Sequence, residues 1–304
     1  MNILVTGGMG FLGSTLVKML RERGDRVISF DRKAIESDDH QLTYVQGDLL
    51  DFSLLLETIK KYEVERIIHT AAISHPAAAI DIPYQTVLTN AVGTTHVFEA
   101  ARLSGIKRVV NLSSEYAYGN NEHLVTTNED IPLHPTGVYG ATKVFTEKLA
   151  GGYRNHYGME IPSLRPGWIY GPGQFMQCYM KTLLRNAIDG VPTIEPEGRD
   201  HGFQYVHVRD VAQACILACT VDSLDTYVYS ITAGDKIAYG DLIGLVKDLY
   251  PEAKIDVGEG NFSVIDRYAT IDISRARKEL GYQPVYDLKS GVEMYAKWLE
   301  SHPY

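Results

Sequence analysis

Residues 1–31 read MNILVTGGMGFLGSTLVKMLRERGDRVISFD, and this stretch decides the fold of the chain. Residues 2–6 are a short apolar run with β-branched side chains, which is typical of a buried parallel strand. A glycine-rich turn follows, and residues 14–23 then place apolar side chains on one face of a predicted helix. A second strand is expected over 27–30, ending on Asp31. This order of strand, glycine turn, helix, strand and acid predicts a dinucleotide-binding unit.

The glycines let the backbone turn tightly and approach a pyrophosphate without a Cβ in the way, and the helix start favours phosphate oxygens. The cofactor-binding positions predicted in this turn are Gly7, Gly10, Phe11, Leu12 and Gly13. Asp31 stands eighteen residues after Gly13, where a carboxylate binds ribose hydroxyls, and it favours NAD. Arg32 follows directly and is suited to the 2′-phosphate of NADP, so NADP is not excluded.

The composition is that of an ordinary globular protein. The chain has 304 residues, enough for about two domains, and its 45% hydrophobic residues can form a sizeable core. A net charge of −9 without a long basic run argues against nucleic acid or an anionic membrane as partner. No apolar run approaches the ~20 residues of a membrane span, and the opening strand leaves no room for a signal peptide. Cys178, Cys215 and Cys219 form no disulfide-like or metal-like framework, so we expect a cytoplasmic location and no metal.

Strands and helices alternate along the first half of the chain. Further strands are expected over 42–45, 66–70 and 108–112, and helices over 52–62, 84–103 and 138–156, with a polar surface loop at 32–41. The predicted fold class is therefore α/β, with a Rossmann-type, doubly wound parallel sheet in residues 1–166.

Residues 167–304 are expected to form mainly a smaller, mixed α/β substrate domain, with some segments returning to the first domain. The helices expected here cover 175–188, 211–219, 239–250, 274–280 and 288–299, and the strands cover 203–208 and 227–231.

Small and polar residues follow the predicted strands, at the sheet edge where ligands bind in this architecture. Asp48 can accept a hydrogen bond from the adenine amino group, or alternatively cap the helix that begins near residue 52. Ala71 and Ala72 allow close approach of a flat group such as the nicotinamide ribose.

Two histidines near the end of the fourth strand receive different predictions. His69 is expected to be a packed, hydrogen-bonded side chain. His75 and its neighbour Ser74 are better candidates for the pocket.

Three side chains predict the chemistry. Tyr139 and Lys143 are four residues apart and project from one helical face. A tyrosine pKa near ~10 is too high for a base at neutral pH, but a nearby ammonium and an oxidised nicotinamide stabilise the phenolate. Ser114, at the end of a strand and twenty-five residues before Tyr139, is placed to hold a substrate oxygen. We therefore predict a catalytic trio that takes a proton from a secondary alcohol.

The chain resembles the extended short-chain dehydrogenase/reductase family, which holds nucleotide-sugar epimerases and dehydratases, over nearly its whole length. The matching motifs are Thr6 to Gly13, Gly47-Asp48-Leu49, His69-Thr70-Ala71-Ala72, Asn90, Ser113-Ser114, Tyr139-x-x-x-Lys143, Leu164-Arg165-Pro166, Ile169 to Gly173, Tyr205 to Ala212 and Leu280 to Pro284. The resemblance implies catalytic roles for Ser114, Tyr139 and Lys143. It also implies cofactor contacts from Leu49, Thr70, Asn90 and Pro166, and a homodimer built from helices 84–103 and 138–156.

Departures from the family pattern concern the substrate. Dehydratases carry a glutamate two positions after the catalytic hydroxyl, where this chain has Tyr116 after Glu115, so a dehydratase is disfavoured. Trp168 stands where nucleotide-sugar enzymes usually carry an asparagine, and His201 stands at a usual arginine position. His201, Arg199 or Arg267 could substitute at the diphosphate, although the favoured interpretation of each is an ordinary surface or loop residue.

The predicted function is an NAD-dependent oxidoreductase or epimerase that acts on a secondary hydroxyl of a sugar or nucleotide sugar. The alternative is a dehydrogenase or reductase of a small non-nucleotide sugar, sugar acid or other hydroxy compound. A catalytically silent cofactor-binding protein on the same fold is the hypothesis from another class. The substrate-contacting candidates are Ser74, Ser114, Glu115, Tyr116, Trp168, His201 and Arg267.

Overall fold

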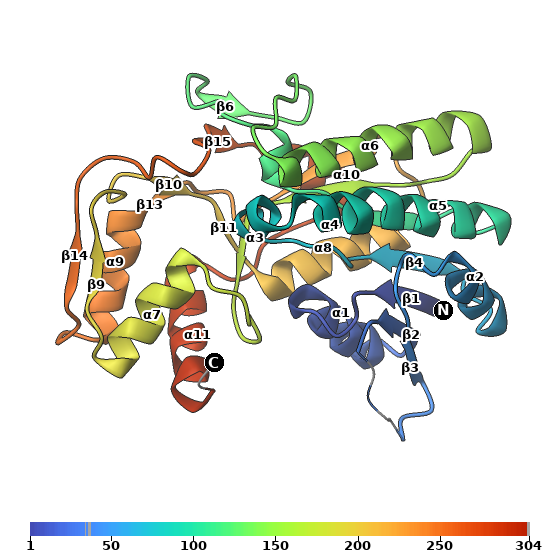
Figure 1. Ribbon diagram of the computed structural model, residues 1–304, viewed down its shortest axis with the longest axis horizontal. Coiled ribbons are helices and arrows are strands. Elements are labelled where there is room, and N and C mark those ends of the chain that lie inside the picture. Colours follow the sequence, from blue (N-terminus) through green and yellow to red (C-terminus); the bar gives the residue numbers. More distant parts are fainter. Residues whose placement is uncertain (34, 36–37, 303–304) are drawn as a thin grey trace.

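The computed structural model describes residues 1–33, 35 and 38–302, and its centre is a seven-stranded parallel sheet (Figure 1). The strand order is β12-β7-β5-β4-β1-β2-β3. The chain first adds β2 and β3 on one side of β1 and then crosses to add β4 and β5 on the other side, as in a doubly wound fold. The strands are β1 (Asn2–Thr6), β2 (Arg26–Asp31), β3 (Leu42–Gln46), β4 (Arg66–His69), β5 (Val109–Leu112), β7 (Ser163–Pro166) and β12 (Val228–Ile231). Leu4 pairs with Ile28 of β2 and Ile67 of β4, so the register places apolar residues together.

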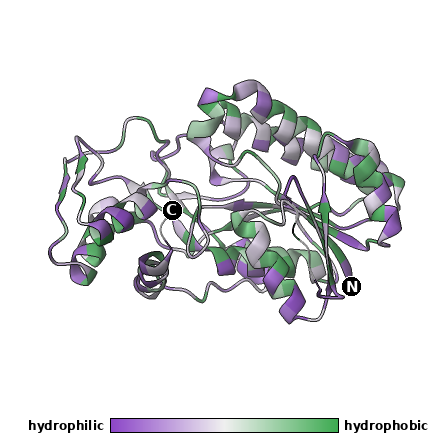
Figure 2. Cartoon of the chain, turned by 60° about the horizontal axis from the view of Figure 1, so that its bottom comes forward, coloured by the Kyte–Doolittle hydropathy of each residue, from purple (hydrophilic) through white to green (hydrophobic). Residues whose placement is uncertain are grey.

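Helices cover both faces of the sheet. One layer contains α1 (Phe11–Glu22), α8 (Val208–Thr220) and α10 (Ser274–Leu280), and the other contains α2 (Phe52–Lys61), α5 (Thr94–Leu103) and α6 (Val138–Tyr157). Ile3 and Val5 pack under the first layer, whereas Leu4 between them packs under the second. This alternation explains why the strand is apolar throughout. The flanking helices carry both apolar and polar residues, as Figure 2 shows by colour.

The long helix expected over 84–103 is not uniform. It consists of α4 (Pro83–Val87), the π-helical segment η1 (Leu88–Gly93) and α5, and a short α3 (Pro76–Asp81) precedes it. A Cβ at Gly93 would lie 2.9 Å from the Leu49 side chain, so close packing of this segment requires glycine. The wider turn places Asn90 toward the loop that follows β4.

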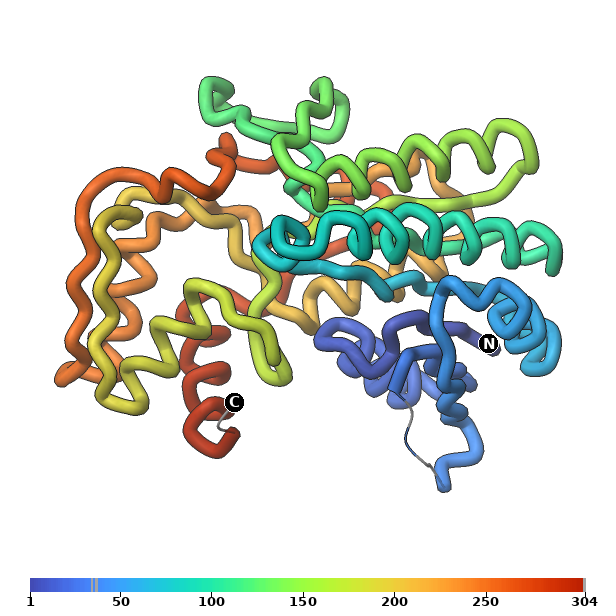
Figure 3. The backbone as a smooth tube through the Cα atoms, in the orientation of Figure 1, coloured from blue at the N-terminus to red at the C-terminus, as the bar shows by residue number. Residues whose placement is uncertain are grey.

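The second half of the chain, apart from β7, β12, α8 and α10, forms a helical unit at one end of the sheet, on the left in Figures 1 and 3. Its helices are α7 (Tyr179–Asp189), α9 (Tyr239–Leu249) and α11 (Leu288–Ser301), and its short strand pairs are β9 (Thr193–Glu195) with β14 (Ile255–Val257) and β10 (Gly202–Phe203) with β13 (Ile237–Ala238). Between the two units lie the pairs β8 (Trp168–Tyr170) with β11 (Tyr205–His207) and β6 (Thr126–Thr127) with β15 (Thr270–Ile271). Tyr205, Phe203 and Tyr239 are part of an aromatic core under these elements.

Two further local predictions differ from the structure, and a third falls partly outside the described residues. The helix expected from residue 175 begins at Tyr179, because residues 171–178 form a loop over a cavity. The strand expected over 203–208 divides into β10 and β11. Residues 34, 36 and 37 of the expected loop 32–41 lie outside the described residues. Within the described part of the chain, no helix is long and apolar enough to cross a membrane.

Candidate functional site

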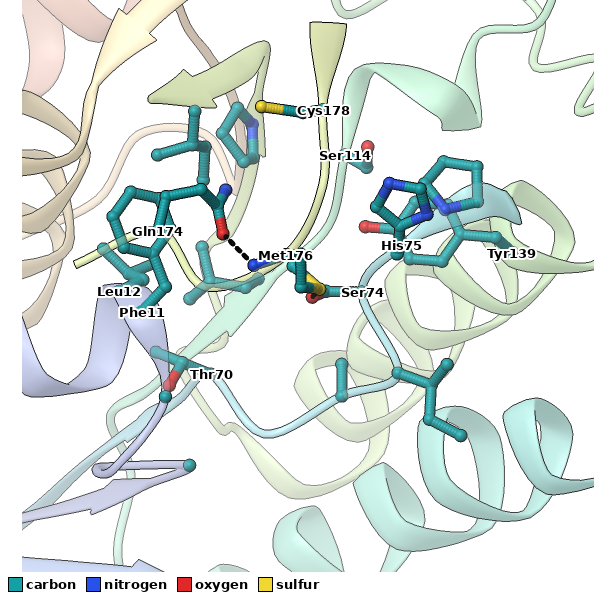
Figure 4. A pocket seen from close by; sticks show the side chains of 18 of the residues that line it. Phe11, Leu12, Thr70, Ser74, His75, Ser114, Tyr139, Gln174, Met176 and Cys178 are labelled. Atoms are coloured by element: carbon teal, nitrogen blue, oxygen red, sulfur yellow. Dashed lines mark hydrogen bonds between the residues drawn. The ribbon is translucent and has the colours of Figure 1, made fainter. Parts of the chain in front are cut away.

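The site is a cavity of about 900 Å³ at the carboxyl ends of β1 and β4, where the strand order reverses. Ligands bind at this place in doubly wound folds. Its walls come from the glycine turn, the loops after β2 to β5, the start of α6 and the 171–178 segment. Figure 4 shows Phe11, Leu12 and Gln174 on one side of the view and His75, Ser114 and Tyr139 on the other.

The glycine turn folds back on itself beneath one end of the cavity. Gly7 has a positive φ of 70°, and its carbonyl accepts a hydrogen bond from the Gly10 N–H at 2.9 Å. A Cβ at Gly13 would lie 2.8 Å from the Gly7 carbonyl carbon and closer still to its oxygen. Gly10 precedes α1 without a side-chain cap, so the first N–H groups of the helix at Phe11 and Leu12 remain available to an anion.

The acids at the ends of β2 and β3 line the same end of the cavity. Asp31 accepts hydrogen bonds from the N–H groups of Met9 and Lys33, both at 3.1 Å, which holds its carboxylate beside the glycine turn. Arg32 and Leu49 also line this end.

Asp48 follows β3, and its position distinguishes between the two roles predicted for it. It lines the cavity and accepts from the Leu50 N–H at 2.9 Å, whereas Asp51 caps α2 through the Leu54 N–H. The capping role predicted as an alternative for Asp48 is therefore wrong.

The loop after β4 forms the middle of the cavity wall. The Thr70 hydroxyl donates to the Thr6 carbonyl at 2.7 Å, and Ala71 and Ala72 present small side chains to the cavity. Asn90 does not line the cavity; its amide oxygen and nitrogen bond the backbone N–H and carbonyl of Ile73. Asn90 thus shapes the loop.

His69 is a packed residue, as expected. Its ring nitrogens lie 2.7 Å from the Thr6 hydroxyl and 2.9 Å from the Thr94 hydroxyl. Burial lowers the pKa of His69 to about 3, so the ring is neutral.

Ser114, Tyr139 and Lys143 converge where β5 and α6 meet the cavity, and Pro166 at the end of β7 lines it beside them. Gly140 allows α6 to approach closely, because a Cβ there would lie 3.2 Å from the Tyr116 carbonyl carbon. The Lys143 ammonium lies 5.6 Å from the centre of the Tyr139 ring and donates to the Leu112 carbonyl at 2.6 Å.

Burial governs the ionisation of this trio. It raises the pKa of Tyr139 to about 12, which the Ser114 hydroxyl opposes and the Glu115 charge reinforces. Burial likewise lowers the pKa of Lys143 to about 8, against the favourable charge of Glu147. Both groups therefore favour their neutral forms more than they do in water.

An ion pair lies behind the trio. Arg165 binds both carboxylate oxygens of Glu147, at 2.8 and 2.6 Å, with both side chains buried. Ser113 donates a third hydrogen bond to the same carboxylate. This network fixes the end of β7 against α6.

The opposite end of the cavity faces the helical unit. Glu115, Tyr116, Trp168 and Ser74 line it, as predicted for contacts with substrate. Tyr116 lies centrally among the rings, 5.8 Å from Tyr139 and 6.2 Å from Trp168 between centroids.

Sequence reasoning missed several residues of this wall. They are Phe175, Met176, Gln177, Cys178, Tyr179, Thr182, Glu195, Tyr239, Val264 and Ile265. The 171–178 segment bridges to the loop after β4: the His75 ring lies 2.8 Å from the Gln177 carbonyl, and the Ser74 hydroxyl 4.0 Å from the Met176 sulfur. The Gly171-Pro172-Gly173 run is the signal that identifies this segment as loop.

His201 and Arg267 are not brought to this cavity. The His201 ring is 1% exposed and packs 4.7 Å from Phe203, so it is enclosed by the aromatic core. Arg267 forms an ion pair with Glu122 at 2.8 Å and lines a second hollow, which shares Val264 and Ile265 with the cavity wall. Arg199 is also absent from the cavity walls among the described residues. The structure therefore places none of these three side chains in the cavity wall, and their contact with an anion stays a prediction.

Comparison with known proteins matches this geometry. The model of the family described as NAD dependent epimerase/dehydratase family matches residues 3–231. The chain belongs to this family. It is similar to the dTDP-glucose 4,6-dehydratase of Streptomyces antibioticus, with 30% identity over 321 residues that cover 98% of this chain and 92% of the relative.

Solved structures of the epimerase type share the whole fold. The UDP-glucose 4-epimerase of Thermotoga maritima, solved with UDP-glucose, has a TM-score of 0.91 at 26% identity, with 99% of each chain covered. MoeE5, solved with UDP-glucuronic acid and NAD, has a TM-score of 0.90 at 26% identity and the same coverage. The predictions of the family, the doubly wound fold, an enzyme of the extended type and NAD as cofactor are confirmed.

Proposed function

We propose that this family member oxidises a secondary hydroxyl of a sugar or nucleotide-sugar substrate, with Tyr139 as the base. The observation that carries the proposal is the meeting of Ser114, Tyr139 and Lys143 at one wall of the cavity that begins at the glycine turn. A proton acceptor, a hydroxyl donor and a cation thus adjoin the place where the family holds its cofactor.

The residues present fit NAD. A Cβ at Gly13 would collide with the Gly7 carbonyl, so glycine there keeps the turn tight, and the N-terminus of α1 has no side-chain cap, which suits a pyrophosphate. Asp31 would hold the adenosine ribose, and Asp48 and Leu49 would flank the adenine. Thr70, Ala71, Ala72 and Pro166 would line the remainder. The nicotinamide, when bound, supplies the hydride acceptor.

The chain's own residues move the proton. Ser114 holds the substrate oxygen, and Tyr139 takes the hydroxyl proton onto its phenolate oxygen as the carbonyl forms. Burial raises the pKa of Tyr139 to about 12. We expect the Lys143 ammonium and the positive charge of an oxidised cofactor to lower the pKa during the reaction. Glu115 and Tyr116 stand where dehydratases carry their acidic pair. This replacement favours a reaction without elimination of water, in which the hydride either stays on the cofactor or is returned to the substrate.

Two net reactions are compatible with this trio. In an epimerase the keto intermediate stays bound and is reduced on its other face, whereas in a dehydrogenase the ketone or lactone leaves. Stoichiometric co-purification of NAD favours the epimerase. A cofactor-free protein that forms NADH with a sugar favours the dehydrogenase.

A homodimer is part of the proposal. Helices α3, α4 and α6 pack together and expose large apolar side chains, among them Ile80 at 79%, Tyr84 at 71% and Phe145 at 45%. Such a surface is typical of an interface. We expect Tyr84→Glu to shift the sedimenting species from dimer to monomer, while Val285→Glu on another exposed surface leaves it unchanged. The same species for both variants would refute this interface.

A cytoplasmic location is also proposed. It is supported by three free cysteines, two of which are buried. A disulfide between any of them in protein isolated without reductant would argue against it.

Tyr139→Phe tests the base. Turnover, measured as NADH formation and as epimerisation by NMR across sugars and nucleotide sugars, is expected to fall at least ~100-fold. Cofactor affinity, measured by calorimetry, should stay within a few fold. Tyr157→Phe, at a half-exposed position on α6, is the matched control and should retain activity. Full activity in Tyr139→Phe would end the assignment.

A further inference from the structure

The substrate end of the cavity, beyond Tyr139, is aromatic and acidic. We call it the polyol subsite and define it by Glu115, Tyr116, Trp168, Tyr179, Glu195 and Tyr239, all of which line the cavity. Trp168 stands centrally, with its ring centroid 6.2 Å from that of Tyr116 and 6.3 Å from that of Tyr179. Aromatic faces of this kind pack against the C–H faces of a sugar ring, and their polar edges reach its hydroxyls.

Positive charge is scarce at this subsite. Among the described residues that line the whole cavity, Arg32 and Lys33 lie at the adenosine end, and Lys143 is the remaining lysine or arginine. The Lys143 ammonium is already bound to the Leu112 carbonyl at 2.6 Å. A diphosphate in this subsite would therefore contact aromatic rings and two carboxyl groups, and no arginine among the described residues of the subsite would bind it.

Nearby cations outside the cavity are engaged elsewhere. Lys181 donates to the Phe175 carbonyl at 2.9 Å, and Lys236 donates to the Tyr268 carbonyl at 2.6 Å. Arg267 is paired with Glu122 at 2.8 Å. None of the three lines the cavity.

Glu115 is the unusual member of the subsite. It is 2% exposed, and its Oε2 atom has no hydrogen-bond partner among the described residues. Burial and the nearby charge of Asp266 raise the pKa of this carboxyl well above its usual range. A buried polar atom without a protein partner is normally satisfied by water or by a ligand. A protonated carboxyl offers one donor and one acceptor, which matches the donor and acceptor of a single hydroxyl group, and it supplies no positive charge to a phosphate.

We propose that the substrate is a small uncharged polyhydroxylated compound, a free sugar or sugar alcohol without phosphate, and that Glu115 determines specificity by bonding one of its hydroxyls. This inference rests on the proposed hydroxyl oxidation at Tyr139 and narrows its substrate. It departs from the UDP-sugar ligands of the similar solved structures. The aromatic rings bind the carbon skeleton, Glu115 orients it, and Ser114 and Tyr139 meet the hydroxyl that reacts.

The first test compares ligand classes on the full chain saturated with NAD. Calorimetric titration with UDP and UDP-glucose is expected to show no binding up to millimolar concentration. A panel of neutral aldoses, ketoses and alditols should contain at least one compound that binds saturably or forms NADH. Binding of UDP or UDP-glucose at micromolar concentration would overturn the proposal. So would a panel in which only carboxylate- or phosphate-bearing sugars respond.

The second test uses the neutral compound that responds. Glu115→Leu is expected to weaken its binding at least tenfold, whereas Glu115→Gln, which keeps a donor and an acceptor, should stay within about threefold of the wild type. Glu122→Gln, at an exposed position outside the cavity, is the matched control. Equal affinity in wild type and Glu115→Leu would overturn the role of Glu115.

Two readouts separate this inference from the proposed function. NAD binding and the loss of turnover in Tyr139→Phe report on the proposed function. The ligand class and the Glu115 variants report on the polyol subsite. A protein that turns over a UDP-sugar through Tyr139 would thus refute the inference and leave the proposed function standing.

Discussion

Replacing Gly13 by alanine tests the cofactor site at its tightest contact. A Cβ at this position would lie 2.8 Å from the Gly7 carbonyl carbon and from the Gly8 Cα, both of which are backbone atoms. Ordinary carbon contacts are about 3.5 Å, so the turn must open by roughly 0.7 Å or more. The N–H groups that would hold the pyrophosphate move with it. Because hydrogen bonds to a charged group contribute roughly 1.5–3 kcal/mol each and 1.4 kcal/mol is about tenfold in affinity, we expect the Kd for NAD to rise by about 100-fold.

Two further substitutions make this a graded series. A Cβ at Gly10 would lie 3.1 Å from the Gly7 oxygen, so Gly10→Ala should weaken NAD binding by no more than about tenfold. At Gly151 in α6 no described atom outside the local helix lies within 4 Å, and Gly151→Ala should leave the affinity unchanged. Calorimetric titration with NAD measures the affinity of each variant, and urea unfolding verifies that each variant is folded. A Gly13→Ala protein that is folded and binds NAD within threefold of wild type would refute the reasoning.

Three stability predictions concern the buried charges behind and beside the trio. Arg165→Met leaves the Glu147 carboxylate buried without its partner and should lower the free energy of unfolding by about 3–5 kcal/mol. The double variant with Glu147→Met should lose less stability than this single variant. Additive losses of the two substitutions in urea titrations would contradict this prediction. The free energy of unfolding of Glu115→Gln should equal that of the wild type below about pH 4.5 and exceed it increasingly at higher pH, because the wild-type carboxyl ionises when the protein unfolds. A stability difference that does not vary between pH 5 and pH 8 would exclude a raised pKa. The pKa of Lys143 falls from 10.5 to about 8 in the folded protein. The free energy of unfolding of the wild type should therefore rise by about 2 kcal/mol relative to Lys143→Met between pH 7 and pH 9.5. Thermal unfolding that shows no such rise would place the pKa of Lys143 near its usual value.

The cofactor half of the molecule could be predicted closely because its signals are local. Apolar runs, a glycine turn and helical periodicity lie within about thirty residues of one another, and β1 is Asn2–Thr6 as expected. The four-residue spacing of Tyr139 and Lys143 likewise places both on one face of α6.

The remainder depends on contacts between distant segments. The π-helical turn at Leu88–Gly93 packs against Leu49, which periodicity within the helix does not show. The pKa of Glu115 is raised by burial and by the charge of Asp266, which lies 151 positions later in the chain. His201 is a candidate for binding an anion because it stands at a usual arginine position of the family, but the aromatic core encloses it. In each case the deciding neighbour is set by tertiary packing.

The bridge from His75 to the Gln177 carbonyl bears on how quickly the enzyme could exchange its dinucleotide. This contact and the one between Ser74 and Met176 join the two halves of the molecule across the mouth of the cavity. A dehydrogenase must release reduced coenzyme in every cycle, so the bridge would have to part once per turnover. An epimerase regenerates its coenzyme in place, and the same bridge could then stay intact through many successive cycles.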